Sequence, residues 1–159
     1  MLSAAAYSFR QKSRLAISLS WVAGYTNVIL FILCAVVVSH ATGNVTHLGQ
    51  KLAELRPHDA WRQGGWLVVL FFAGAVSSAV MTEGARRRGL VSKYVLPIAV
   101  EALLLCTLAV LINYYSLDAG TSVTFARSPN LDYALSGIAS FAMGLQNAAV
   151  RRIGAPDLT

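Results

Sequence analysis

Four long apolar blocks dominate this sequence of 159 residues, and each is long enough to cross a lipid bilayer. A membrane-spanning helix needs about 20 predominantly apolar residues. Only helices and closed barrels satisfy every backbone group in lipid, and blocks of this length indicate helices. The chain is therefore predicted to be all-α, a single polytopic transmembrane helical bundle over residues 1–159. The four expected spans lie at about Leu15–Ser39, Gly65–Thr82, Val95–Tyr115 and Leu131–Val150.

The basic residues lie beside these blocks and predict the orientation of the chain. Only 13% of the residues are charged, about half the share of a typical soluble domain. The net charge of +6 gathers at block ends, so it is interpreted as orienting the chain in its expected partner, the lipid bilayer, and no nucleic acid is expected as a partner. Lysine and arginine concentrate on the cytoplasmic side of membrane proteins, so both termini are expected in the cytoplasm. Nine of these residues fall on the side of the termini: Arg10, Lys12, Arg14, Arg86, Arg87, Arg88, Lys93, Arg151 and Arg152. Four fall on the other side: Lys51, Arg56, Arg62 and Arg127.

Two segments that lie 120 residues apart repeat one pattern. Ser20–Asn27 reads SWVAGYTN and Ser140–Asn147 reads SFAMGLQN, so serine, glycine and asparagine share one helical face in each. The first would cross outward and the second inward, which predicts an inverted repeat of three helices per unit, as in many secondary transporters. Four helices make only the first part of a 3+3 repeat. We expect a chain that is incomplete at its C-terminus, or a natural short form that pairs as a homodimer.

Four stretches together resemble the YoaK family of uncharacterised bacterial integral membrane proteins. They are WVAGYTNVI, SHATGNVTHLG, VEALLL and FAMGLQNAAVRRIG, and the resemblance runs from about residue 15 to residue 156. It implies a six-helix protein of the bacterial inner membrane with no established activity. One departure is Asn27, where many relatives are expected to carry aspartate. A neutral amide there puts a proton-coupling role for that position in doubt.

The stretch VVVSHATGNVTHLG follows the first apolar block and predicts a break in the helix. Glycine tolerates backbone angles that other residues avoid, so Gly43 is the expected turning point. Polar side chains of His40, Thr42 and Asn44 would satisfy the backbone groups that the break frees. Broken helices of this kind form the substrate sites of many transporters.

Other polar residues fall within the predicted spans and have two interpretations. Glu101 costs at least ~2.5–3.5 kcal/mol in hydrocarbon. It is either a proton or cation site, or a neutral acid bonded to Asn27, Asn147 or a backbone carbonyl. The asparagines either bind a solute or only join helices. The residues of the expected pathway are Asn27, His40, Thr42, Gly43, Asn44, Glu101 and Asn147. The small residues expected at helix contacts are Ser20, Gly24, Gly74, Ser78, Ser140 and Gly144.

No spacing in the sequence matches a catalytic triad, a phosphate-binding loop or a metal site, so neither an enzyme nor a cofactor is expected. His40 and His47 lack a third ligand, and Cys34 and Cys106 are interpreted as small buried hydrophobic residues. The leading hypothesis is a small-molecule or ion transporter of the inner membrane. The alternative is a membrane scaffold or accessory subunit whose polar residues only join helices.

Overall fold

The computed structural model describes residues 9–89, 94–117 and 129–154, and these residues are helical apart from short connections. The six α-helices are α1 (Phe9–Cys34), α2 (Ala41–Ala53), α3 (Pro57–Ala60), α4 (Trp66–Arg87), α5 (Val95–Leu117) and α6 (Pro129–Gly154). A π-helical turn, η1 (Trp61–Gly65), joins α3 to α4. No strand occurs in these ranges, so the predicted all-α class is confirmed. Lys93 and Arg127, which were counted for the orientation, lie outside the described residues.

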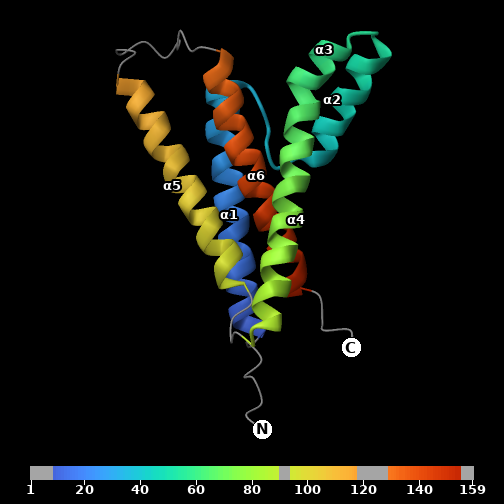
Figure 1. Cartoon of the computed structure of the whole chain (residues 1–159). Coiled ribbons are helices and arrows are strands. Elements are labelled where there is room, and N and C mark those ends of the chain that lie inside the picture. The colour runs from blue at the N-terminus through green and yellow to red at the C-terminus, as the bar shows by residue number, and fades with distance from the viewer. Residues whose placement is uncertain (1–8, 90–93, 118–128, 155–159) are drawn as a thin grey trace.

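The four long helices run side by side in alternating directions (Figure 1). The start of α1 and the end of α6 lie at one end of the bundle, and α2 and α3 lie at the other. The central helix is α6, which packs most extensively on α4 and also contacts α5 and α1. The upper part of α5 diverges from its neighbours.

Within the described ranges, three helices are long and apolar enough to cross a membrane: Ser13–Cys34, Trp66–Arg87 and Val95–Tyr114. These correspond to the first three predicted spans and indicate a multi-pass membrane protein. The first ends at Cys34 rather than Ser39, because the chain leaves the helix there. The predicted fourth span is also a helix, α6, but it is not among the three. Its buried face carries polar and small residues that lower its mean hydropathy: Ser136, Gly137, Ser140, Gly144 and Gln146.

Small residues bring α4 and α6 into close contact. A Cβ atom added to Gly74 would collide with the carbonyl oxygen of Phe141, and one added to Gly144 would collide with that of Phe71. The hydroxyl of Ser140 donates a hydrogen bond of 2.8 Å to the carbonyl oxygen of Leu67. The two backbones therefore approach as closely as helices do in membrane proteins with small residues at their interfaces.

The matching small residues of α1 make no such contact. Ser20 is exposed and its hydroxyl donates to the Ala16 carbonyl oxygen of its own helix at 2.9 Å. A Cβ atom on Gly24 would meet no described atom within 4 Å. Instead α1 is tied to α6 by the buried Gln146, whose amide donates to the Leu19 carbonyl oxygen. The expected contact through Ser20 and Gly24 is therefore not formed, and the inverted repeat is not confirmed.

Candidate solute-binding site

The chain turns back into the bundle directly after α1. Ala35 has a positive φ of 54°, a conformation that costs a residue with a side chain roughly 1–2 kcal/mol. Residues 35–40, which we call the break segment, then run from the far end of α1 towards the middle of the bundle, where α2 begins (Figure 1). The break is therefore real, but the turning point is Ala35, not the predicted Gly43, which lies in the first turn of α2.

Asn27 of α1 holds the break segment from one side. Its Oδ1 accepts hydrogen bonds from the backbone amides of Val38 at 3.1 Å and Ser39 at 3.0 Å. Its Nδ2 donates to the hydroxyl of Ser39. Backbone groups freed inside a membrane need such partners, so this side chain satisfies the break rather than facing an open site.

Asn44 of α2 holds the same segment from the other side. Its Nδ2 donates to the carbonyl oxygen of Val37 at 3.1 Å, and the residue is buried. His40 was expected to satisfy backbone groups that the break frees, but it stands at the N-cap of α2 and its side chain makes no capping hydrogen bond there. Two asparagines, from different helices, therefore fix a segment that has no regular secondary structure.

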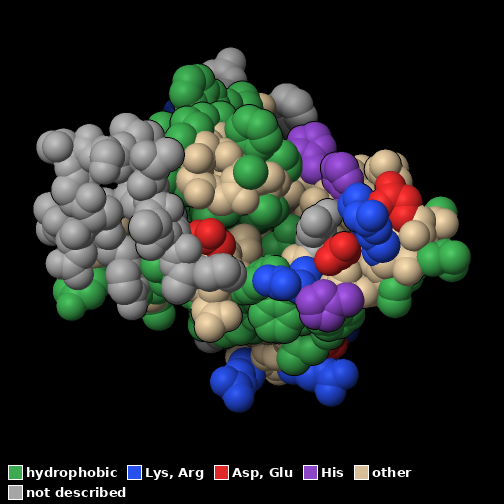
Figure 2. Space-filling view, turned by 90° about the horizontal axis from the view of Figure 1, so that it is seen from above, with side chains coloured by type: hydrophobic (Ala, Val, Ile, Leu, Met, Phe, Trp, Pro, Cys, Tyr) green, Lys and Arg blue, Asp and Glu red, His purple; other side chains and the backbone are tan. Residues whose placement is uncertain are grey.

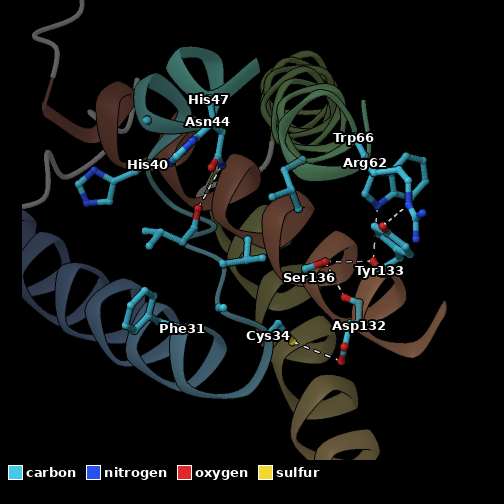
Figure 3. Close-up of a pocket in the computed structure, with 15 residues that line it drawn as sticks. Phe31, Cys34, His40, Asn44, His47, Arg62, Trp66, Asp132, Tyr133 and Ser136 are labelled. Carbon is cyan, nitrogen blue, oxygen red and sulfur yellow. Dashed lines mark hydrogen bonds between the residues drawn. The ribbon is translucent and has the colours of Figure 1, made fainter. Parts of the chain in front are cut away.

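A cavity of about 710 Å³ lies beside the break segment (Figure 3). The end of α1, the start of α2, η1 with the start of α4, and the start of α6 surround it. Its volume is within the range of sites that bind small molecules. The predicted residues His40, Gly43 and Asn44 line it. Sequence reasoning missed most of the other polar lining, which is His47, Arg62, Trp66, Asp132, Tyr133 and Ser136.

The wall formed by η1 and α6 is cross-linked by polar contacts. The Nε of Arg62 donates a 2.6 Å hydrogen bond to the hydroxyl of Tyr133, and the guanidinium carbon lies 5.3 Å from the centre of that ring. The indole of Trp66 donates to the Tyr133 carbonyl oxygen at 3.5 Å. Ser136 donates to the carbonyl oxygen of Asp132 at 2.6 Å (Figure 3). These contacts orient Arg62 and the start of α6 before any solute arrives.

The Asp132 carboxylate extends towards the end of α1. Its Oδ1 accepts a contact of 3.8 Å from the Sγ of Cys34 (Figure 3). Asp132 stands in the first turn of α6, where a helix favours negative charge. An acidic residue in the first turn of a predicted helix was the one sequence signal that could have identified it.

The remaining predicted pathway residues lie outside this cavity. Thr42 is exposed on α2, and Glu101 is buried on α5, with 3% of its surface exposed and no hydrogen bond to a described residue. Asn147 is exposed beside a smaller cavity of about 210 Å³ that Ser39 also lines. The described structure therefore does not gather Glu101, Asn27 and Asn147 into one central site. The second cysteine, Cys106, is exposed on α5 rather than buried, since that part of α5 faces outward.

The end of the bundle that carries α2 and α3 is polar. Seen from above, charged and histidine side chains gather there beside the hydrophobic surface (Figure 2). Lys51 and Glu54 form an exposed ion pair of 2.8 Å, and this hydrogen bond lowers the pKa of the Glu54 carboxyl below its ordinary value. Such a surface fits the end of a bundle that projects from the bilayer into water.

Comparison with known proteins identifies the family but no activity. The model of the family described as "Protein of unknown function (DUF1275)" matches residues 15–159, so the chain belongs to this family. No curated protein and no solved structure matches the chain.

Proposed function

Because its family assigns no activity, we propose from the cavity that this chain is a membrane transporter for a small polar solute. The observation that carries the proposal is a cavity of about 710 Å³ at a broken helix. The break is held in place by side chains of α1 and α2, so the site keeps its shape without a ligand. Irregular backbone within a bundle is tolerated where it lines a cavity, and transporters bind solutes there. No catalytic chemistry is part of the proposal.

The proposed setting is the bacterial inner membrane, with four spans and both termini in the cytoplasm. Its support is the shared position of the start of α1, the end of α4 and the end of α6 at one end of the bundle (Figure 1). Arg86, Arg87 and Arg88 lie there, which fits the cytoplasmic preference of basic residues. As a fourth span, α6 has 26 residues and runs alongside the other three. The resemblance to the YoaK family agrees with this setting.

The inverted repeat and the homodimer also remain part of the proposal. Support for the repeat comes from α1 and α6, which run in opposite directions (Figure 1). In α6 the serine–glycine face packs on α4, whereas the equivalent face of α1, with Ser20 and Gly24, is exposed. A second copy could cover that face.

The alternative function is a scaffold that transports nothing. It is favoured by the hydrogen bonds of Asn27, Ser140 and Gln146, each of which is made to another part of the same chain. Residues of this kind join helices and need no solute to explain them.

The two native cysteines provide the test, because Cys34 lines the cavity and Cys106 is exposed on α5. The variant Cys106→Ala retains only Cys34, and the variant Cys34→Ala retains only Cys106. A charged thiol reagent is applied to each variant in intact cells and in inside-out vesicles. Transport requires that the solution on each side reach Cys34 in turn, whereas Cys106, in contact with lipid, stays unlabelled. Labelling of Cys34 from one side only, or from neither, would favour the scaffold.

A further inference from the structure

Opposite charges line one wall of the cavity, Arg62 from η1 and Asp132 from α6. We propose that the cavity binds a small zwitterion, a solute that carries an amine and a carboxylate on one apolar body, as a neutral amino acid does. The inference rests on the proposed function, since it names the solute class for the same cavity.

The carboxylate end of the solute would meet Arg62. The Nε of Arg62 donates a hydrogen bond to the hydroxyl of Tyr133, and the guanidinium group lies over the ring of that tyrosine. The terminal Nη groups of the guanidinium make no hydrogen bond to a described residue. A guanidinium held in one plane presents these donors in a fork that matches the two oxygens of a carboxylate.

The amine end would meet Asp132. This carboxylate lies near Cys34 at the end of α1, on the residue that directly precedes Tyr133 in α6 (Figure 3). Asp132 is the only acidic residue among the described residues that line the cavity. A charge-assisted bond from an ammonium group is therefore best made at this point.

The body of the solute would lie against apolar side chains. Phe31 and Leu67 line the cavity together with Val36 and Val37 of the break segment. Such a surface favours an aliphatic side chain through burial of its apolar area. One positive and one negative group on the walls match a solute of no net charge.

A solute with only one of the two charges loses the charge-assisted hydrogen bond to the other wall group. The loss of one hydrogen bond to a charged group typically weakens binding by about tenfold or more. Leucine is therefore compared with 3-methylbutylamine, which lacks the carboxylate, and with 4-methylpentanoate, which lacks the amine. Glycerophosphoethanolamine represents the other source of a zwitterion, a lipid headgroup.

The experiment measures binding of these four compounds to the full chain in detergent by calorimetry. We expect leucine to bind at least tenfold more tightly than the other three compounds. Arg62→Gln and Asp132→Asn should each remove this preference, whereas Arg56→Gln and Asp59→Asn, at the same end of the bundle but outside the cavity, should keep it. The unfolding temperature of each variant without ligand shows that it is folded.

Equal binding of leucine and either fragment, or tighter binding of the headgroup, would overturn the zwitterion assignment. So would an unchanged preference in folded Arg62→Gln and Asp132→Asn. These outcomes are separate from a failure of the proposed function. If Cys34 is labelled from both sides while leucine shows no preference, the solute class is wrong and transport stands; if leucine binds as expected and Cys34 is labelled from one side only, the site stands and transport falls.

Discussion

At the scale of single residues, two side-chain amides, the half-buried Asn27 and the buried Asn44, hold an irregular backbone segment inside an apolar bundle. Asn27 accepts hydrogen bonds from two consecutive backbone amides of the break segment, and Asn44 donates to one carbonyl of it. In water these groups would find solvent partners, but within a bilayer an unmet backbone group is costly. The break therefore depends on side chains that lie 11 or 12 residues before it, and 7 residues after it, along the chain.

Replacing Asn27 tests this dependence. Asn27→Leu removes all three hydrogen bonds and is expected to destabilise the protein by about 2–4 kcal/mol. Asn27→Asp keeps the acceptor oxygen for both amides and loses only the donor to Ser39, so a smaller loss is expected. Asn147→Leu is the matched control, because Asn147 is exposed on the equivalent position of α6. Unfolding in detergent measures the three variants, and an equal loss for Asn27→Leu and Asn147→Leu would contradict the assigned role.

The turning point gives a second prediction at this scale. Gly43 lies within α2, and an added Cβ would meet only the Cβ of His40 at an ordinary 3.7 Å. Gly43→Ala is therefore expected to preserve or raise stability, by up to about 1 kcal/mol from helix propensity. Ala35 needs the positive φ, so Ala35→Gly should stabilise by about 1 kcal/mol and Ala35→Val should destabilise. Thermal unfolding distinguishes this pattern from the reverse one, which a turn at Gly43 would produce.

At the scale of elements, the contact of α4 with α6 positions the wall of the cavity. The Phe71 carbonyl of α4 lies against Gly144 of α6, and the Leu67 carbonyl accepts a hydrogen bond from the Ser140 hydroxyl. This contact fixes the register of the two helices, and thereby the position of Trp66 at the start of α4 against Tyr133 at the start of α6. A larger side chain at one of these small residues should therefore shift α4 against α6 and so alter the wall of the cavity.

Gly144→Ala tests the contact, with Gly24→Ala as its control at the repeated position of α1. The added methyl group at residue 144 collides with the backbone of α4, which typically costs about 1–3 kcal/mol. At residue 24 it meets nothing within 4 Å, so no loss is expected, and helix propensity favours alanine there by up to about 1 kcal/mol. The measurement is the unfolding free energy of each variant in detergent, and comparable losses at both positions would show that α1 also has a close helix partner.

The particular residues show which parts of the structure were predictable. The apolar blocks predicted the helices closely, because each block must be helical in lipid, and the polar stretch after the first block predicted the break. The positive φ of Ala35 could not be predicted, since alanine disfavours that conformation and the segment that it opens is held by Asn27 and Asn44. Arg62 and Asp132 could not be paired either, because they are 70 residues apart and only the packing of α6 on α4 brings them to one cavity.

At the scale of the whole molecule, the number of crossings decides on which side each polar element lies. Three crossings place the end of α5 opposite the start of α1, and a fourth by α6 would return the chain to the first side. Among the long helices, α6 is the best buried. Its polar residues Ser140 and Gln146 lie against α4 and α1. A helix shielded in this way can cross a bilayer with a lower mean hydropathy than one that faces lipid on all sides.

Reporter fusions settle this number of crossings. A fluorescent protein that matures only in the cytoplasm, and a phosphatase active only outside it, are joined after Glu54, Arg88, Leu117 or Gly154. With both termini inside and four spans, we expect phosphatase activity after Glu54 and Leu117, and fluorescence after Arg88 and Gly154. Phosphatase activity after Gly154 would mean that α6 does not cross, and the C-terminus would then lie outside. Of the helices that border the cavity, only α1 and α4 would then cross to the cytoplasmic side, and the proposed transport path would lose its central helix.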